Sequence, residues 1–293
     1  ARRGELAGDE ALAHHARFLA KRGVNIVRLH GNITPKKPGQ KITDIDQDQL
    51  DEMWRLVAAM KKEGIYTIIS PYWGSHVDWK AEWGVPNPAN GKLTALVFFE
   101  PTVQNAYKAW LKAIYTTPNP HTGVPLSQDP AVAIIQLQNE DSMLFGSMRS
   151  VKGDAIKVLK KQYADWLTKK YGSMEKAAEA WGGFVPDDEK PIEGLPNLWM
   201  PWEFTGDARM KKGQGAPPGR EKSLADQFQF MAETMFNFNK MIGEYLRNDL
   251  GCKQLVNAGN WRTMDQVYMD DAERWSYTAN EVLGKNHYYG GIH

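Results

Sequence analysis

Short aliphatic runs alternate with longer amphipathic segments along this chain, and this alternation constrains its fold more than any other feature. The aliphatic runs are rich in Val, Ile and Leu, as expected of strands in a buried parallel sheet. We predict strands at residues 23–30, 65–70, 132–137, 253–258 and 281–286. We predict helices at residues 9–22, 46–63, 101–115, 155–170, 174–181, 223–250 and 271–278. Strands that alternate with helices pair in parallel, so the sequence predicts an α/β fold.

Each predicted strand ends in polar or aromatic side chains. These are Arg28 and His30, Tyr72 and Trp73, Asn139 and Glu140, Asn260 and Trp261, and His287 and Tyr288. Two architectures fit the alternation, a doubly wound open sheet and an eight-stranded barrel. In a barrel the carboxyl ends of all strands meet at one mouth, so these side chains would form one site. No glycine-rich phosphate loop follows the first strand, which further favours a (β/α)8 TIM barrel over the open sheet.

The predicted strands are too few to close a barrel of eight. We therefore expect residues 1–293 to form a single, incomplete catalytic-barrel domain that covers roughly the second to the sixth strand. Residues 182–222 carry Gly, Pro and charged residues without periodicity. We expect this segment to cross the surface between the fourth and fifth barrel strands.

Composition narrows the range of partners and sites. The 36 basic and 35 acidic side chains give a net charge of +1, which points to neither a nucleic acid nor a membrane as partner. The only cysteine, Cys252, excludes an internal disulfide and a Cys-rich zinc site, and the histidines lack metal-ligand spacing. We therefore expect no metal and no cofactor. The oligomeric state and the compartment are not determined, although we favour a secreted or periplasmic location over a cytoplasmic one.

The segment AVAIIQLQNEDS at residues 131–142 places an amide and a carboxylate side by side where an aliphatic strand ends. The strand and its aromatic neighbours would partly exclude water from Glu140, which favours a carboxyl group that protonates a leaving sugar oxygen. Asn139 could bind a sugar hydroxyl next to the reacting carbon. The alternative interpretation is that Glu140 caps the helix that follows.

Several segments resemble clan A glycoside hydrolases, which are (β/α)8 barrels with a retaining mechanism. IIQLQNEDS resembles their fourth-strand acid/base segment, and GVNIVRLHG resembles the second strand of family 5 enzymes. WLTKKYGSMEKAAEAWG is similar to a helix pair of family 42 β-galactosidases, and GKNHYYGG to the sixth-strand Asn-x-Tyr-Tyr-Gly of family 2 enzymes. The resemblance implies a retaining glycoside hydrolase that cleaves a β-linked oligo- or polysaccharide.

The resemblance also implies roles for individual residues. Glu140 would be the general acid/base, Asn139 the contact to the sugar 2-hydroxyl, Arg28 the second-strand arginine, and Tyr288 the tyrosine that donates to the nucleophile. The nucleophile itself would be a second glutamate, which we expect beyond residue 293. The third strand departs from family 5, because residues 70–73 stand where many members have a histidine. The candidate substrate contacts are His30, Tyr72, Trp73, Asn260, Trp261 and His287.

Other interpretations stay open at the level of sequence. A non-catalytic carbohydrate-binding barrel, or an inactive truncated fragment, would have the cleft without the nucleophile. A barrel enzyme for phosphorylated metabolites would need a glycine-rich phosphate loop near the seventh and eighth strands, and the aromatic strand ends argue against it. Arg28 could form a buried ion pair that only closes the barrel. Trp73 and Trp261 could equally pack in the core or stack on sugar rings.

Overall fold

A parallel four-stranded sheet lies at the centre of the computed structural model, which describes residues 8–72, 74–213 and 215–287. The sheet has the order β1-β2-β3-β4, and its strands are β1 (Ile26–His30), β2 (Tyr66–Ser70), β3 (Val132–Gln136) and β4 (Leu255–Asn257). Within the described residues the α-helices are α1 (Gly8–Ala20), α2 (Gln47–Lys62), α3 (Pro101–Thr116), α4 (Gly153–Tyr171), α5 (Met174–Ala180), α6 (Gly206–Gly213), α7 (Pro218–Glu244) and α8 (Asp270–Tyr277). The parallel pairing and the alternation of helices with strands confirm the predicted α/β fold.

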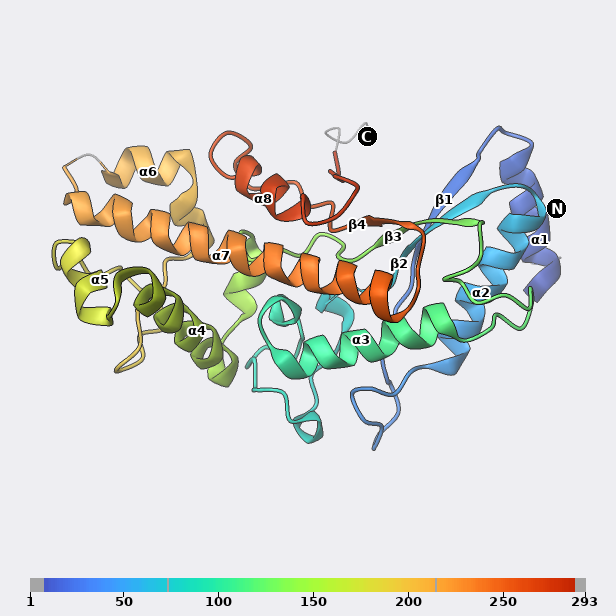
Figure 1. Ribbon diagram of the computed structural model, residues 1–293, viewed down its shortest axis with the longest axis horizontal. Helices are drawn as coiled ribbons and strands as arrows, with labels where there is room; N and C mark the ends of the chain where they lie inside the picture. The colour runs from blue at the N-terminus through green and yellow to red at the C-terminus, as the bar shows by residue number, and fades with distance from the viewer. Residues whose placement is uncertain (1–7, 73, 214, 288–293) are drawn as a thin grey trace.

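Short helical turns occupy several of the connections. The 3-10 turns are η1 (Gly74–His76), η2 (Ala81–Trp83), η3 (Leu96–Phe98), η4 (Gly146–Ser150) and η5 (Pro201–Phe204), and the π-helical turn η6 (Tyr245–Asp249) follows α7. Figure 1 shows α1 and α2 beside the strands, whereas α4, α5 and α6 gather around the first half of α7, away from the sheet. Helix α8 packs along α7. Among the described helices, none combines the length and the apolar character needed to cross a membrane.

Helices cover one face of the sheet. In the described part of the chain the opposite face, the open face, is exposed where the strands begin, at Ile26, Tyr66 and Leu255, and buried where β2, β3 and β4 end, at Ser70, Gln136 and Asn257. Strand register places Ile69, Ile135 and Val256 side by side on the covered face, where all three side chains are buried. The next row, on the opposite face, runs from Arg28 in β1 to Leu255 in β4, and Leu255 is 50% exposed. The sheet therefore presents a mixed polar and apolar surface on the side away from its helices.

Side-chain caps set the start of the helices that precede β2 and β3. The Oδ1 atom of Asp46 accepts a hydrogen bond from the Gln49 N–H at 3.2 Å, so α2 begins after Asp46. The Oε2 atom of Glu100 accepts from the Val103 N–H at 2.7 Å, and Pro101 occupies the first position of α3. These caps explain why the two helices begin close to their predicted starts.

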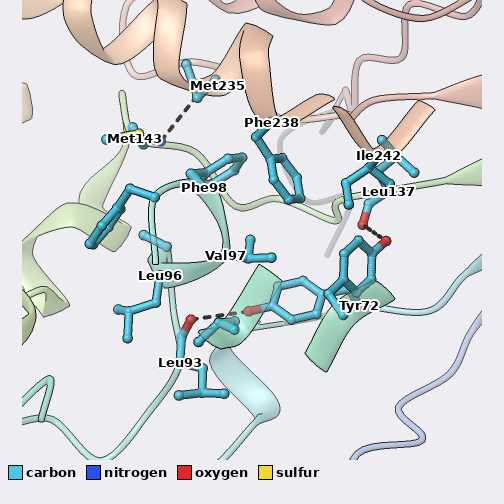
Figure 2. Close-up of a cluster of buried hydrophobic side chains, with 14 of the residues drawn as sticks. Tyr72, Leu93, Leu96, Val97, Phe98, Leu137, Met143, Met235, Phe238 and Ile242 are labelled. Atoms are coloured by element: carbon cyan, nitrogen blue, oxygen red, sulfur yellow. Dashed lines mark hydrogen bonds between the residues drawn. The ribbon is translucent and has the colours of Figure 1, made fainter. Parts of the chain in front are cut away.

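An aromatic core supports the carboxyl ends of the strands (Figure 2). The rings of Phe98 and Phe238 meet edge to face with centroids 5.4 Å apart. The buried hydroxyl group of Tyr107 in α3 donates to the carbonyl oxygen of Leu137 at 3.0 Å. Because Leu137 is the first residue after β3, this hydrogen bond fixes the direction in which the chain leaves the sheet.

The predicted strand at residues 281–286 is wrong. Val282 forms only an isolated parallel bridge with Asn257. The side-chain amide of Asn257 donates to the Val282 carbonyl oxygen at 3.2 Å, and the guanidinium of Arg274 donates to the Gly284 carbonyl oxygen. Side-chain donors thus occupy carbonyl groups that a strand would offer to its neighbour, and the ladder stops.

The segment 182–222 is packed more closely than the surface crossing expected from its composition. It contains α6, and α7 begins before its predicted start. The buried indole N–H of Trp199 donates to the Ser223 Oγ atom at 3.1 Å, and Arg220 forms a buried ion pair with Glu203 at 3.0 Å. Single anchor residues hold this segment against α7, and such anchors leave no periodic signal in a sequence.

Candidate functional site

The chain enters the candidate site at the carboxyl end of β3. Parallel pairing continues past the strand, because the Leu137 N–H donates to the Asn257 carbonyl at 2.8 Å and the Gln138 N–H donates to that of Ala258 at 3.1 Å. The backbone then turns at Glu140, whose φ of 49° lies in the left-handed region that non-glycine residues rarely adopt. Such strain persists only where the surroundings hold it, and it is concentrated at functional sites.

Three asparagines hold the turn at Glu140. The Glu140 N–H donates to the Oδ1 atom of Asn260 at 2.9 Å, and the Asn260 Nδ2 atom donates to the Asn139 Oδ1 atom at 3.1 Å. The side-chain amide of Asn286 donates to the Oε1 atom of Glu140, which is itself half-buried. Asn260 is 4% exposed and uses both ends of its amide here. Its predicted role therefore changes from substrate contact to support of Glu140.

Arg28 and His30 lie on the open face of the sheet, and the charge of Glu140 affects the pKa of both side chains. The Nη1 atom of Arg28 donates to the Oε1 atom of Gln136 at 3.4 Å. Partial burial and the charge of Arg28 lower the pKa of His30, and the charge of Glu140 opposes both effects. Burial also lowers the pKa of Arg28, again against the charge of Glu140. The structure thus brings together three of the residues predicted from strand ends.

A polar cavity of about 390 Å³ opens beside Glu140. Hydroxyl groups, an amide, an ammonium group and two carboxyl groups contribute to its wall. The lining residues are Ser75, Asn90, Lys92, Thr94, Glu140, Asp141, Phe145, Gly146, Ser147 and Ser150. The ammonium group of Lys92 also pairs with Asp78. The wall of this cavity therefore offers several hydrogen-bonding groups around Glu140.

Asp141 fixes the wall of the cavity. Its Oδ2 atom accepts from the Ala95 N–H at 2.9 Å, and its Oδ1 atom accepts from the Ser142 N–H at 3.0 Å. Burial raises the pKa of Asp141, and the hydrogen bonds from Ala95, Ser147 and Ser142 oppose the rise. Ala95 also has a left-handed backbone, with φ of 62°. Two strained residues, Ala95 and Glu140, are therefore linked through Asp141.

Phe145 and Trp261 form an aromatic contact beside the cavity. Their ring centroids lie 3.7 Å apart with the planes inclined by 39°. Phe145 lines the cavity, and Trp261 is half-buried behind it. Trp261 thus contributes to the site through Phe145, and its stacking on a sugar ring stays a prediction.

Tyr72 does not line the cavity, contrary to the prediction. Its side chain is 1% exposed, its hydroxyl group donates to the Leu93 carbonyl oxygen at 3.2 Å, and its ring packs against Tyr107. Figure 2 shows Tyr72 among the buried side chains of the core. An aromatic residue that follows a strand can serve the core or the cleft, and the sequence does not distinguish the two.

Two predicted residues, Trp73 and Tyr288, lie outside the described residues. His287 is described, and its side chain is exposed in the segment that follows Asn286. The roles of Trp73, His287 and Tyr288 stay predictions.

Three residues that the sequence interpretation did not select belong to the site or support it. Asn286 lies within the GKNHYYGG segment, so the signal was present but was assigned to other residues. Gln136 interrupts an aliphatic strand, and its Nε2 atom donates to the Gln138 carbonyl oxygen at 2.7 Å. Glu273 is fully buried in α8, where its Oε2 atom accepts from the Ser142 hydroxyl at 2.6 Å. A helical carboxylate usually faces solvent, so no sequence signal marked Glu273.

A larger cavity of about 540 Å³ lies along α7 and α8, away from Glu140. Apolar side chains form most of its wall, among them Phe204, Leu224, Phe228 and Trp275, and no predicted site residue contributes to it. The smaller cavity is the better candidate, because it combines a carboxyl group on strained backbone with polar neighbours. In the described part of the chain, no group of three or more His, Cys, Asp or Glu side chains could hold a metal ion.

The fold and the site together define an α/β protein with a polar cleft at the carboxyl edge of a parallel sheet. No family model matches the chain, and no curated protein matches it. The chain is similar to the endo-beta-1,4-mannanase from Thermotoga petrophila, with 12% identity and a TM-score of 0.37 over 95% of this chain and 64% of that one.

Two further solved structures show the same degree of similarity. A beta-glucosidase has 12% identity and a TM-score of 0.39, over 87% of this chain and 48% of its own length. A glycoside hydrolase family 5 mannosidase from Rhizomucor miehei has 12% identity and a TM-score of 0.33, over 93% and 72%. The chain thus spans less than two thirds of the mannanase and about half of the glucosidase. At these identities and TM-scores, the similarities do not bear on substrate or catalytic residues.

Proposed function

We propose that this chain belongs to the catalytic barrel of a retaining glycoside hydrolase that cleaves a β-linked oligo- or polysaccharide, with Glu140 as general acid/base. The observation that carries the proposal is the setting of Glu140. Its half-buried carboxyl group stands on strained backbone, is held by Asn286, and lines a polar cavity. A helix cap would need neither the strain nor the cavity, so the capping alternative is disfavoured.

The arrangement of the sheet supports the barrel part of the proposal. Doubly wound sheets reverse their strand order and carry helices on both faces. Here the strands follow one another in chain order, and helices cover one face. In a (β/α)8 barrel the open face, with Arg28 and Leu255, would become the interior. Under this proposal β1 to β4 are the second to the fifth strand of one domain.

The proposed reaction begins with acid catalysis by Glu140. Its carboxyl group transfers a proton to the glycosidic oxygen while the bond from that oxygen to the anomeric carbon breaks, and the resulting carboxylate later takes a proton from the attacking water. Retention requires a second carboxylate about 5 Å away, which forms the glycosyl intermediate. We expect this nucleophile beyond residue 293.

Two neighbours of Glu140 have supporting roles in this proposal. Arg28 places a positive charge within the electrostatic influence of Glu140, because the charge of Glu140 raises the pKa of Arg28 against the effect of burial. Asn139 is 2% exposed, and its Oδ1 atom is engaged by Asn260. A contact from Asn139 to the sugar 2-hydroxyl would therefore use its amide N–H groups as donors.

The alternative is a non-catalytic carbohydrate-binding barrel. The polar cavity with Phe145 in its wall is the observation that favours it, because binding requires these features but no nucleophile. A panel of chromogenic aryl β-glycosides, assayed with the complete gene product and paired with oligosaccharide binding by calorimetry, separates the two. Turnover supports the hydrolase, and binding without turnover supports the binding protein. Neither binding nor turnover across the panel contradicts both.

A further inference from the structure

A buried carboxyl group lies directly behind the candidate site. Glu273 in α8 is 0% exposed, and its two oxygen atoms accept hydrogen bonds from two different segments. Oε2 accepts from the Ser142 hydroxyl at 2.6 Å, and Oε1 accepts from the Tyr277 hydroxyl at 2.6 Å. Ser142 follows Glu140 by two residues, so Glu273 joins α8 to the segment that carries Glu140.

The same helix also holds the chain beyond β4. The Trp261 N–H donates to the Tyr277 hydroxyl oxygen at 3.2 Å, and the Arg274 guanidinium donates to the Trp261 carbonyl oxygen. Trp261 directly follows Asn260, which accepts the hydrogen bond from the Glu140 N–H. Both segments that meet at Glu140 are therefore attached to one helix.

We propose that Glu273 is a positioning residue for Glu140, because it joins the segment after β3, through Ser142, to the segment after β4, through Tyr277. This inference rests on the function proposed above, since it gives the orientation of Glu140 a consequence for turnover. Glu273 itself has no access to substrate, because its side chain is fully buried.

The hydrogen bonds that Glu273 forms depend on whether its carboxyl group is charged. Burial raises the pKa of Glu273 to about 7, and the hydrogen bonds from Ser142 and Tyr277 and the charge of Arg274 oppose the rise. Asp270, one turn earlier in α8, adds to it. The uncharged groups that contact Glu273 are the hydroxyl groups of Ser142, in the segment after β3, and of Tyr277, and Met235 of α7 lies next to Ser142. Glu273 therefore changes charge near neutral pH.

Protonation of Glu273 reverses its hydrogen bond to Ser142. A proton on Oε2 makes this atom a donor to the Ser142 Oγ atom, and the Ser142 hydroxyl hydrogen then turns to the Met235 Sδ atom, 3.5 Å away. A thioether is a weak acceptor, so Ser142 is held less firmly when Glu273 is neutral. The Leu144 N–H, which donates to the Ser142 Oγ atom at 3.0 Å, reports on this change.

Hydrogen exchange of the backbone amides tests the connection without any assay of activity. In the wild-type protein, protection of Leu144 and Trp261, corrected for intrinsic exchange, should change with a midpoint near pH 7. In Glu273→Gln, which carries no charge, protection should stay at the low-pH level throughout. Ser142→Ala should abolish the pH-dependent change in protection at Leu144 and leave the change at Trp261. Glu179→Gln, an exposed change in α5, should behave as the wild type.

Turnover of aryl β-glycosides by the same variants then links the connection to function. Glu273→Gln should lower kcat at pH 8 by roughly 10- to 100-fold, with little change in KM and without the wild-type step near pH 7. A step in protection or in kcat that persists in Glu273→Gln overturns the inference. If no variant shows turnover while the exchange step follows Glu273, the connection stands and the proposed hydrolase fails.

Discussion

The backbone N–H of Glu140 donates to the side-chain oxygen of Asn260 over 2.9 Å, which joins the segments that follow β3 and β4. This hydrogen bond satisfies a backbone group at a residue whose φ is 49°. The strained turn is therefore held from a neighbouring strand, and it presents the carboxyl group of Glu140 to the polar cavity.

Replacement of Asn260 by Ala should release this turn. The change leaves the Glu140 N–H and the Asn139 Oδ1 atom without their partner, and a buried polar group left unpaired costs about 1–3 kcal/mol in the free energy of unfolding. Urea unfolding measures the loss. Asn248→Ala, at an exposed position of the π-helical turn, is the matched control. Equal stability of the two variants would show that the bond does not hold the turn.

Tyr72→Phe should affect stability and not the cleft. The change removes the hydrogen bond to the Leu93 carbonyl oxygen, at a cost of about 1 kcal/mol, and leaves the packing intact. KM for a glycoside should stay unchanged, whereas Asn90→Ala, in the cavity wall, should raise it. A higher KM in Tyr72→Phe would restore Tyr72 to the substrate site.

Asn286→Ala should lower kcat with little change in stability. Asn286 donates to the Oε1 atom of Glu140, and its loss leaves that carboxyl group less well oriented. We expect a fall in kcat of roughly 10- to 100-fold. Steady-state kinetics at one pH measures the effect, again with Asn248→Ala as control. An unchanged kcat would mean that this contact does not orient the acid.

Stability should depend on pH through Glu273. Its pKa of about 7 in the folded protein lies above the ordinary value of 4.5, so between these values the folded protein holds a proton that the unfolded chain has released. The free energy of unfolding therefore falls as pH rises through this window, by roughly 3 kcal/mol at about 1.4 kcal/mol per pH unit.

Glu273→Gln tests this dependence, because its side chain takes up no proton. Urea unfolding at several values between pH 4.5 and 8 should give a flatter profile for the variant than for the wild type. Parallel profiles would mean that Glu273 titrates alike in the folded and unfolded states.

Sequence patterns predicted the sheet because its strands are short aliphatic runs between helices. The predicted strands at residues 65–70 and 132–137 differ from β2 and β3 by one residue each. The predicted strand at residues 281–286 failed, because Asn257 and Arg274 occupy carbonyl groups of that segment. Such side-chain donors are brought close to the segment only by the fold, so the local hydrophobic pattern does not reveal them.

The same distinction applies to the site. Arg28, His30 and Glu140 were predicted to lie together because the carboxyl ends of parallel strands share one edge, and the charge of Glu140 raises the pKa of both Arg28 and His30 against the effect of burial. Tyr72 was misplaced, because the direction of a side chain beyond a strand end depends on the turn that follows. Glu273 was missed, because its burial results from the packing of α8 against the segments after β3 and β4.

The most direct test of the proposed function is the turnover of aryl β-glycosides by Glu140→Gln in the complete gene product. Loss of the acid should slow substrates with poor leaving groups by about 10²- to 10⁴-fold, and substrates with good leaving groups far less, because only the former need the proton. Glu179→Gln in α5 is the matched control and should retain the wild-type rates. Wild-type rates of Glu140→Gln on poor leaving groups would contradict the assignment of Glu140 as general acid.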